Sequence, residues 1–292
     1  MGDRDERFNY RRSHCVFICG KVYVPLEKKN GRSDKYEFSA YSIYDMDTGK
    51  TSVSTKEIYI DLPVNVKIDP FNLPFPFGTL VDEREGRIVY TVPEEHQIVI
   101  FNIHTEEVSR VEYEHGGLTG RDGSYFDKNY LINRKGELVC VYNRRDGNFI
   151  EVVSLITGKI LDNPEIKKAK WATHVVGIEQ NSRGDYIIAW SHHRARVLNE
   201  QFEELFEFDI EKGICYYSHR CYKHIIIDPF DNIYVQNDEE REGRKISLYD
   251  PEGKLLREFD EMDNFFKMAY YNNHLYLYGR DGKFYESIKI YQ

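Results

Sequence analysis

Four side chains that bind zinc in other proteins lie within ten residues in the segment CYYSHRCYKH, at Cys215, His219, Cys221 and His224. Zinc is held by thiolate and imidazole ligands that converge on it as a tetrahedron. The spacing C-x3-H-x-C-x2-H does not match the common zinc-finger patterns. We therefore expect a loop with a buried cysteine at this segment, and we predict no metal site.

A second set of side chains is suited to polyanions or to stacked bases, because cations alternate there with aromatic residues. The chain as a whole is acidic, with 40 Lys and Arg against 49 Asp and Glu and a net charge of −9. General attraction to nucleic acid is therefore not expected, and a local basic patch is of more interest. The predicted binding residues are Arg144, Arg145, Lys167, Lys168, Lys170, Trp171, His192, His193, Arg194, Tyr217, His219, Arg220 and Lys223.

Motifs that identify common enzyme classes do not occur in the sequence. It contains no phosphate-binding Walker loop, no G-x-S-x-G nucleophile turn and no H-E-x-x-H zinc motif. We therefore predict no catalytic residues, no cofactor and a non-enzymatic protein.

The composition indicates a chain of β-strands. Tyr and Phe number 23 and 17, against only 4 Met, and aromatic residues favour strands. No run approaches the 18 apolar residues of a membrane span, and the charged start MGDRDERFNYRRSH lacks the apolar region of a signal peptide. Five cysteines, an odd number, suggest reduced thiols. Together these features predict a cytoplasmic location without membrane attachment.

The elements that must position the basic and aromatic residues repeat along the chain. GDYIIAW (184–190) aligns with DNIYVQN (231–237), and RARVLNEQFEELFEFD (194–209) aligns with KISLYDPEGKLLREFD (245–260). Each copy reads as four strands joined by polar turns. The second strands of the successive copies begin near Val22, Ile88, Leu138, Tyr186, Ile233 and Leu275.

Six copies of a four-stranded unit predict an all-β fold, a six-bladed β-propeller formed by residues 1–292 as a single domain. The expected blades span residues 14–61, 79–114, 128–161, 172–209, 221–260 and 265–292. The last copy has three strands, and an N-terminal strand at 7–12 is expected to complete its blade. The Pro-rich segment 62–78 is expected to be a loop excursion, because proline cannot donate to a strand ladder.

Two of the copies carry a family resemblance. Residues 224–260, HIIIDPFDNIYVQNDEEREGRKISLYDPEGKLLREFD, resemble an NHL repeat, which is a type of propeller blade. Residues 175–209 are similar, with Asn181 where the family usually has Asp. The resemblance covers these two copies and is weak in the first three. It implies a propeller related to the C-terminal domains of tripartite-motif proteins, which bind protein or single-stranded RNA.

Blade geometry then decides which connections share a face. Turns between the first and second strands and between the third and fourth lie at one end of a blade, and the other connections lie at the opposite end. The basic and aromatic segments fall in the second group. We therefore expect a scaffold that binds a protein partner through the loops of one face. Single-stranded RNA binding by the same loops is the first alternative.

The second alternative is a metal-dependent lyase or lactonase-like enzyme that uses the central channel. The resemblance implies it, because amidating lyases of similar fold hold zinc with histidines from several blades. His174 and His224 are the residues here that precede a first strand in this way, and their registers differ. The alternative therefore has little support in the sequence.

Overall fold

The structure is a computed structural model of the whole chain. It describes residues 9–10, 16–29, 36–53, 79–92, 97–113, 128–143, 148–162, 165–166, 175, 177–191, 193–210, 225–237, 244–262, 265–279 and 284–289. The chain divides into two compact units, residues 1–111 and 112–292. The described residues form no helix that is long and apolar enough to cross a membrane.

Two antiparallel sheets come first along the chain. Sheet 1 has the order β1-β3-β4-β5, with β2 also paired to β3. Its strands are β1 (Asn9–Tyr10), β2 (Val16–Ile18), β3 (Lys21–Lys29), β4 (Tyr36–Asp45) and β5 (Thr51–Val53). Sheet 2 has the order β6-β7-β8-β9, formed by β6 (Thr79–Asp82), β7 (Arg87–Val92), β8 (Gln97–Asn102) and β9 (Val108–Glu112).

Four more sheets belong to the second unit. Sheet 3 consists of β10 (Lys128–Ile132), β11 (Leu138–Asn143), β12 (Asn148–Val153) and β13 (Ile160–Asp162), with β14 (Glu165–Ile166) paired to β12. Sheet 4 consists of β15 (Gly177–Gln180), β16 (Tyr186–Ser191), β17 (Arg194–Leu198) and β18 (Glu204–Asp209). Sheet 5 consists of β19 (Ile225–Ile227), β20 (Ile233–Gln236), β21 (Arg244–Tyr249) and β22 (Leu255–Met262). Sheet 6 has three strands, β23 (Phe265–Tyr271), β24 (His274–Gly279) and β25 (Phe284–Lys289).

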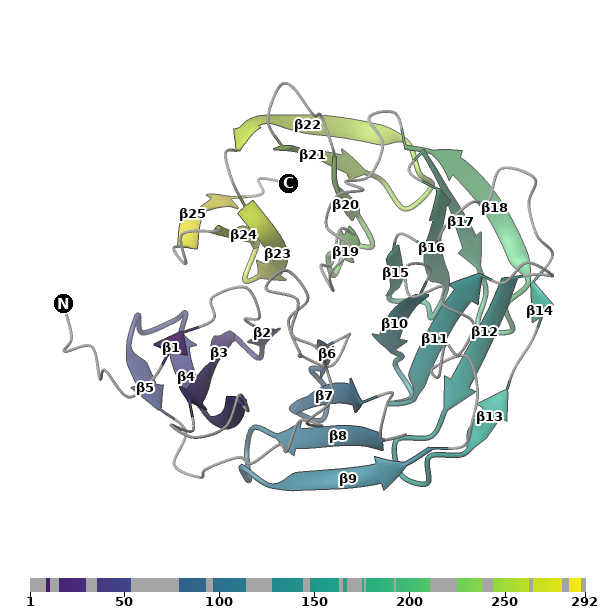
Figure 1. The fold of residues 1–292 in the computed structure, drawn as a ribbon. Helices are drawn as coiled ribbons and strands as arrows, with labels where there is room; N and C mark the ends of the chain where they lie inside the picture. The colour runs from purple at the N-terminus through teal and green to yellow at the C-terminus, as the bar shows by residue number, and fades with distance from the viewer. Residues whose placement is uncertain are drawn as a thin grey trace. The chain divides into compact units, whose positions relative to one another are not determined.

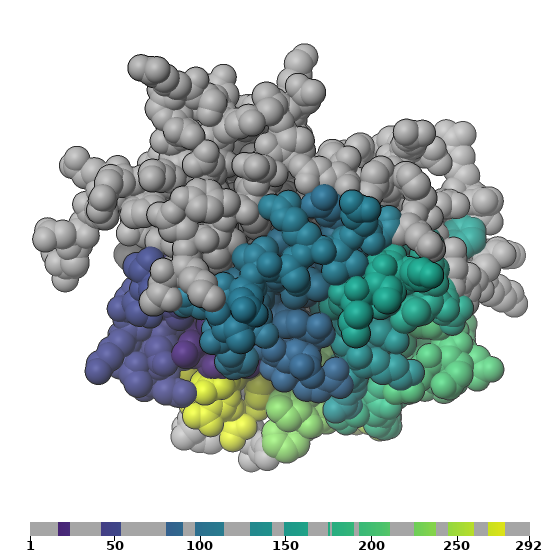
Figure 2. All heavy atoms as spheres, turned by 90° about the horizontal axis from the view of Figure 1, so that it is seen from below, coloured from purple at the N-terminus to yellow at the C-terminus, as the bar shows by residue number. Residues whose placement is uncertain are grey.

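The sheets of the second unit are stacked through their faces. The first strands lie side by side, β10 beside β15, β15 beside β19 and β19 beside β23 (Figure 1). Atoms of sheets 3 and 4, coloured teal to green, lie against one another in the space-filling view (Figure 2). Strand alternation sends one set of side chains to each neighbour, so inner strands such as β17 and β20 are buried on both faces.

Three apolar layers separate these sheets. One lies between sheets 3 and 4, a second between sheets 4 and 5, and a third between sheets 5 and 6. In sheet 4, Ile188 packs toward sheet 3, while its neighbour Ile187 packs toward sheet 5. The β-branched residues of these strands suit a pleated, fully buried sheet.

The prediction of an all-β propeller with four-stranded blades is confirmed. Five of the six sheets contain a path of four hydrogen-bonded strands, and sheet 6 has three among the described residues. The second strands β3, β7, β11, β16, β20 and β24 begin within one residue of the predicted positions. The Pro-rich segment 62–78 lies outside the described residues. The treatment of the chain as one domain stays a prediction.

The prediction that an N-terminal strand completes the last blade is wrong. The described part of that segment, β1, pairs with β3 in sheet 1, where Asn9 lies opposite Glu27 and Tyr10 opposite Leu26. β2 covers only the start of β3, from Lys21 to Tyr23, so the rest of this edge is open to a partner. Pairing with a strand close by in the sequence also closes a much shorter loop than pairing near residue 290.

Candidate functional site

Most of the predicted binding residues lie outside the described part of the chain. These are Arg144, Arg145, Lys167, Lys168, Lys170, Trp171, His192, Tyr217, His219, Arg220 and Lys223, together with the histidine and cysteine cluster of residues 215–224. His193 is described and its side chain is exposed. Arg194 is the first residue of β17, where its Nε donates to Asp209 Oδ1 on β18 at 2.7 Å.

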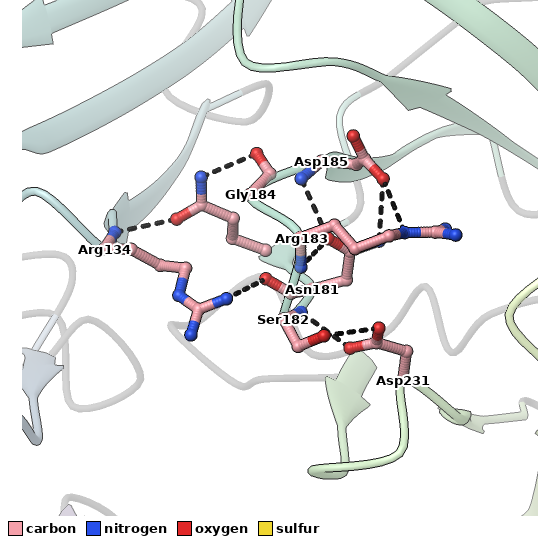
Figure 3. A network of polar contacts seen from close by, with 8 residues as sticks. Arg134, Asn181, Ser182, Arg183, Gly184, Asp185 and Asp231 are labelled. Carbon is pink, nitrogen blue, oxygen red and sulfur yellow. Dashed lines mark hydrogen bonds and ion pairs between the residues drawn. The ribbon is translucent and has the colours of Figure 1, made fainter.

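The described residues bring together a different polar site, at the opposite end of the strands. It is formed by the turns between the first and second strands of sheets 3, 4 and 5, which run over residues 133–137, 181–185 and 228–232. We call it the turn network (Figure 3). Its residues come from three consecutive sheets of the second unit.

Each turn is built on one Asn or Asp side chain. Oδ1 of Asn181 accepts the backbone N–H of Arg183 at 3.0 Å and of Asp185 at 2.8 Å. Asn133 and Asp228 accept the equivalent pairs of N–H groups in their own turns, at 2.8 to 3.0 Å. A short polar side chain that binds its own backbone two and four residues ahead is a strong turn former, and this explains the recurrence of Asn and Asp here.

A second side-chain hydrogen bond closes each turn. In sheet 5 the positions of the amide and the carboxylate are exchanged. The Nδ2 group of Asn181 donates to the carboxylate of Asp185 at 3.0 Å. In sheet 5 the acid comes first, and Nδ2 of Asn232 donates to the carboxylate of Asp228 at 2.9 Å. An amide and a carboxylate therefore face each other in both turns, whichever comes first.

The fourth position of each turn needs a left-handed backbone. Gly136 and Gly184 have φ of 76° and 93°, values that glycine adopts without a steric penalty. Asp231 occupies the same position in sheet 5 with φ of 65°. A non-glycine residue is uncommon in this conformation, although Asp and Asn tolerate it best. The side chain of Asp231 is therefore expected to make a stabilising contact that offsets the backbone strain.

The side chain of Asp231 makes this contact with the neighbouring sheet 4. The two carboxylate oxygens of Asp231 accept the backbone N–H and the hydroxyl of Ser182, at 2.6 and 2.7 Å. A similar contact joins sheets 3 and 4, where the side-chain oxygen of Gln180 in sheet 4 accepts the backbone N–H of Arg134 in sheet 3 at 2.7 Å. Both donors follow the Asn that begins their turn. In sheet 5 this position is Pro229, which has no N–H to donate, so this series of contacts runs from sheet 3 to sheet 5.

Charged side chains add two further links between sheets 3 and 4. The guanidinium of Arg134 donates to the carbonyl oxygen of Asn181 at 3.3 Å. The ammonium of Lys135 lies 3.5 Å from the carboxylate of Glu200, in the turn between β17 and β18. Both side chains of the second pair are largely exposed, so water and salt screen it and its contribution to stability is small.

Two tyrosines lie beneath the turn network. The hydroxyl of Tyr234 donates to the buried carboxylate of Asp228 at 3.1 Å, and that of Tyr186 accepts from Nδ2 of Asn133 at 3.3 Å. Burial raises the pKa of Tyr234, and the nearby charge of Asp228 raises it further. The pKa of Tyr186 is also raised, again mainly by burial. Both phenols are therefore neutral donors or acceptors at physiological pH rather than acids.

The polar groups of this arrangement hold the turns in place by binding one another. The carboxylates of Asp185, Asp228 and Asp231 already accept hydrogen bonds from within the protein. Among the described residues, no three His, Cys, Asp or Glu side chains are grouped so that they could hold a metal ion. The turn network joins three sheets at one end of the strands.

Neither a protein-family model nor a curated protein matches the chain. Among solved structures, it is similar to virginiamycin B lyase from Staphylococcus aureus, with a TM-score of 0.54 and 12% identity over 95% of this chain and 96% of that one. It is also similar to apo AztD from Citrobacter koseri, with a TM-score of 0.52 and 9% identity over 95% and 86% of the two chains. At these identities the likeness shows a β-propeller and nothing about activity.

A further match is Kuenenia stuttgartiensis hydrazine synthase, with a TM-score of 0.48 and 15% identity over 76% of this chain. The chain spans 59% of the length of that protein. The NHL family is not shown by any of these comparisons.

In the sequence, the residues of the turn network stand out only as polar turns between strands. One signal was available, because Asp231 stands where the aligned turn has Gly184. An acid in place of a glycine suggests that the side chain has a role. Its partner Ser182 could not be found in this way, because it lies 49 positions away.

Proposed function

We propose that this protein is a non-enzymatic recognition scaffold that binds a protein partner at the end of the blades opposite the turn network. The observation that supports the proposal most directly is how the turn network uses its side chains. Asn133, Asn181 and Asp228 are all engaged in hydrogen bonds within the protein. That end acts as structural support, which leaves recognition to the other connections.

Those other connections differ from the turns in sequence. They vary in length and contain Lys168, Trp171, Tyr217 and Arg220, whereas the turns are short and repetitive. Loops carried on a rigid scaffold are a frequent place for binding residues. Arginine and aromatic side chains are also enriched in the centres of protein interfaces. A basic group of loops on an acidic protein favours a partner with an acidic surface.

Two finer points of architecture belong to the same proposal. We take the three-stranded sheet 6 as a sixth blade and sheets 4 and 5 as blades of the NHL type. The basis is the aligned repeat of residues 175–209 and 224–260 and the shared design of their turns. With six blades, each of the six sheets formed by the described residues corresponds to one copy of the repeat.

Single-stranded RNA is the second candidate ligand, because aromatic residues and cations occur together in the same segments. Trp171 follows a run with three lysines, and Tyr217 precedes Arg220. Bases stack on aromatic side chains, while cations neutralise the phosphates. RNA binding is therefore expected to weaken steeply between about 50 and about 200 mM salt, whereas a protein interface with an apolar centre depends less on salt.

The experiment compares two charge variants of the full chain as affinity baits. The test variant carries Lys167→Glu, Lys168→Glu and Lys170→Glu, and the control variant carries Lys135→Glu and Arg183→Glu in the turn network. Proteins and RNA retained from extract of the source cells are quantified with and without ribonuclease. The same baits are titrated with pooled single-stranded RNA across a salt series, and the metal content of the purified protein is measured.

A protein that is retained by the wild type and the control, lost with the test variant and indifferent to ribonuclease supports the proposal. Capture that requires RNA, together with steep salt dependence, would favour the second candidate. Equal retention by both variants contradicts a partner site at the basic loops. Stoichiometric zinc, calcium or iron in the protein would instead favour the lyase or lactonase-like enzyme.

A further inference from the structure

We propose that the layer between sheets 4 and 5 contains a binding site for an alkali-metal cation, formed by the side-chain oxygens of Asn237, Ser247 and Glu258. The three residues belong neither to the turn network nor to the predicted binding residues of the basic loops. It is a structural ion site, independent of the function proposed above.

Strand register places the three side chains on one face of sheet 5. Ser247 lies opposite Val235 on one side and opposite Glu258 on the other. Val235 packs toward sheet 4, and cross-strand partners share a face, so Ser247 and Glu258 face sheet 4 as well. Asn237 follows Val235 by two residues and therefore has the same orientation. Its Nδ2 donates to Ser247 Oγ at 2.5 Å.

Two oxygens of this group are buried without a hydrogen-bond donor. Oδ1 of Asn237 and Oε1 of Glu258 have no partner in the described structure. Asn237 and Ser247 are both fully buried, each at 0% exposure. Buried polar atoms are almost always satisfied, so each exception calls for a water or an ion that completes it. Two exceptions on one face, on either side of Ser247, suggest one shared occupant.

The apolar side chains that sheet 4 contributes to this layer are Ile187, Ala189, Ala195, Val197 and Phe208. Ala189 and Ala195 are also the smallest members of that layer and are fully buried.

The donor set selects the class of occupant. An amide oxygen, a hydroxyl oxygen and one carboxylate oxygen are hard ligands that suit alkali-metal and alkaline-earth cations rather than transition metals. Calcium usually takes six to eight oxygens with several carboxylates, and magnesium requires a near-ideal octahedron. One carboxylate balances one positive charge, which favours sodium or potassium. A water would satisfy the two oxygens but carries no charge to balance the carboxylate of the half-buried Glu258.

The test is the thermal unfolding of the full chain in sodium, potassium or N-methylglucamine chloride at equal ionic strength, with calcium chloride as a further arm. Stabilisation by a bound ion grows with its concentration, so we expect the Tm to be roughly 2–4 °C higher in sodium or potassium. Glu258→Gln removes the charge with little change in shape and is expected to abolish the difference. Glu252→Gln, at an exposed position in the turn between β21 and β22, is the matched control and keeps the difference.

Crystals of the wild-type protein soaked in thallium or rubidium give a second measurement that does not require a variant to fold. An anomalous peak within bonding distance of Glu258 Oε1 and Ser247 Oγ supports the site. Equal Tm values in all salts, a response to calcium alone, an unchanged response in Glu258→Gln, or a water without anomalous signal at this position would each overturn the proposal.

Discussion

The carboxylate of Asp231 holds both the backbone N–H and the hydroxyl of Ser182, a residue of the neighbouring sheet, at 2.6 and 2.7 Å. The backbone of Asp231 is left-handed, with φ of 65°, at a position where the two preceding sheets have glycine. One side chain therefore joins sheets 4 and 5 at the end where their turns lie (Figure 3).

The first prediction separates the side-chain contact of Asp231 from the strain of its backbone. Asp231→Ala loses both hydrogen bonds and keeps a side chain at positive φ, so the free energy of unfolding is expected to fall by about 2–3 kcal/mol. Asp231→Gly loses the same bonds without the strain, and its cost is expected to be about 1 kcal/mol smaller. Urea unfolding measures both. If Asp231→Gly is as stable as the wild type, the contact with Ser182 contributes nothing.

The second prediction concerns the reversed polarity of the turns. Asn181→Asp places a second carboxylate against Asp185 and is expected to lower the unfolding free energy by about 1–2 kcal/mol at neutral pH. The double variant Asn181→Asp, Asp185→Asn reproduces the arrangement of Asp228 and Asn232, and is expected to recover most of the loss. A double-mutant cycle gives the coupling energy directly. Additive losses would show that the two positions do not act as a pair.

The third prediction compares two glycines, each in a turn between the third and fourth strands of its sheet. A Cβ at Gly253 would lie 2.4 Å from Cγ of Phe208 in sheet 4, and the φ of Gly253 is 81°. Gly253→Ala is therefore expected to cost more than about 2 kcal/mol, since it adds overpacking to backbone strain. The matched control is Gly49→Ala, where φ is 68° but the nearest atom, Tyr44 Oη, is 3.9 Å away.

For the control, only the backbone term of about 1 kcal/mol is expected. Chemical denaturation of the two variants in parallel measures the difference. Equal costs would mean that Phe208 moves aside freely, and that the glycine is needed only for its backbone conformation.

The fourth prediction is a loss of stability at alkaline pH through Tyr234. Its pKa in the folded protein is raised above the ordinary value of 10.0, mainly by burial. Its contribution to stability is therefore fully present below pH 10.0 and is lost as the pH rises further, because the unfolded chain releases the proton more readily. Tyr234→Phe removes this contribution, so its stability is expected to fall less between neutral pH and about pH 11.

At neutral pH the same variant is expected to lose about 1–2 kcal/mol, because the carboxylate of Asp228 loses one of its donors. Urea midpoints of wild type and variant at the two pH values provide the measurement. Tyr276, a half-buried tyrosine of sheet 6, provides a Phe variant as control for general alkaline effects. An alkaline slope that is identical in wild type and Tyr234→Phe contradicts the prediction.

The repeat predicted the strands and turns well because both depend on residues close together. Alternation of apolar residues in IYVQ and YIIAWS sets the strands β20 and β16, and Asn181 organises its own turn within five residues. The placement of the N-terminal segment failed for the opposite reason. An open strand edge can accept a partner from anywhere in the chain, and no pattern within Asn9–Tyr10 distinguishes β3 from β25.

The sequence by itself determined the class of fold, the period of its blades and the type of each turn, because these follow from side-chain alternation and from local hydrogen bonds. Only the tertiary structure decided that Asp231 binds Ser182, that β1 joins sheet 1, and that Asn237 and Glu258 share a buried face. Each of these relationships joins residues on different strands or sheets. Their distance in space is set by how the strands pair and how the sheets pack, which no local pattern records.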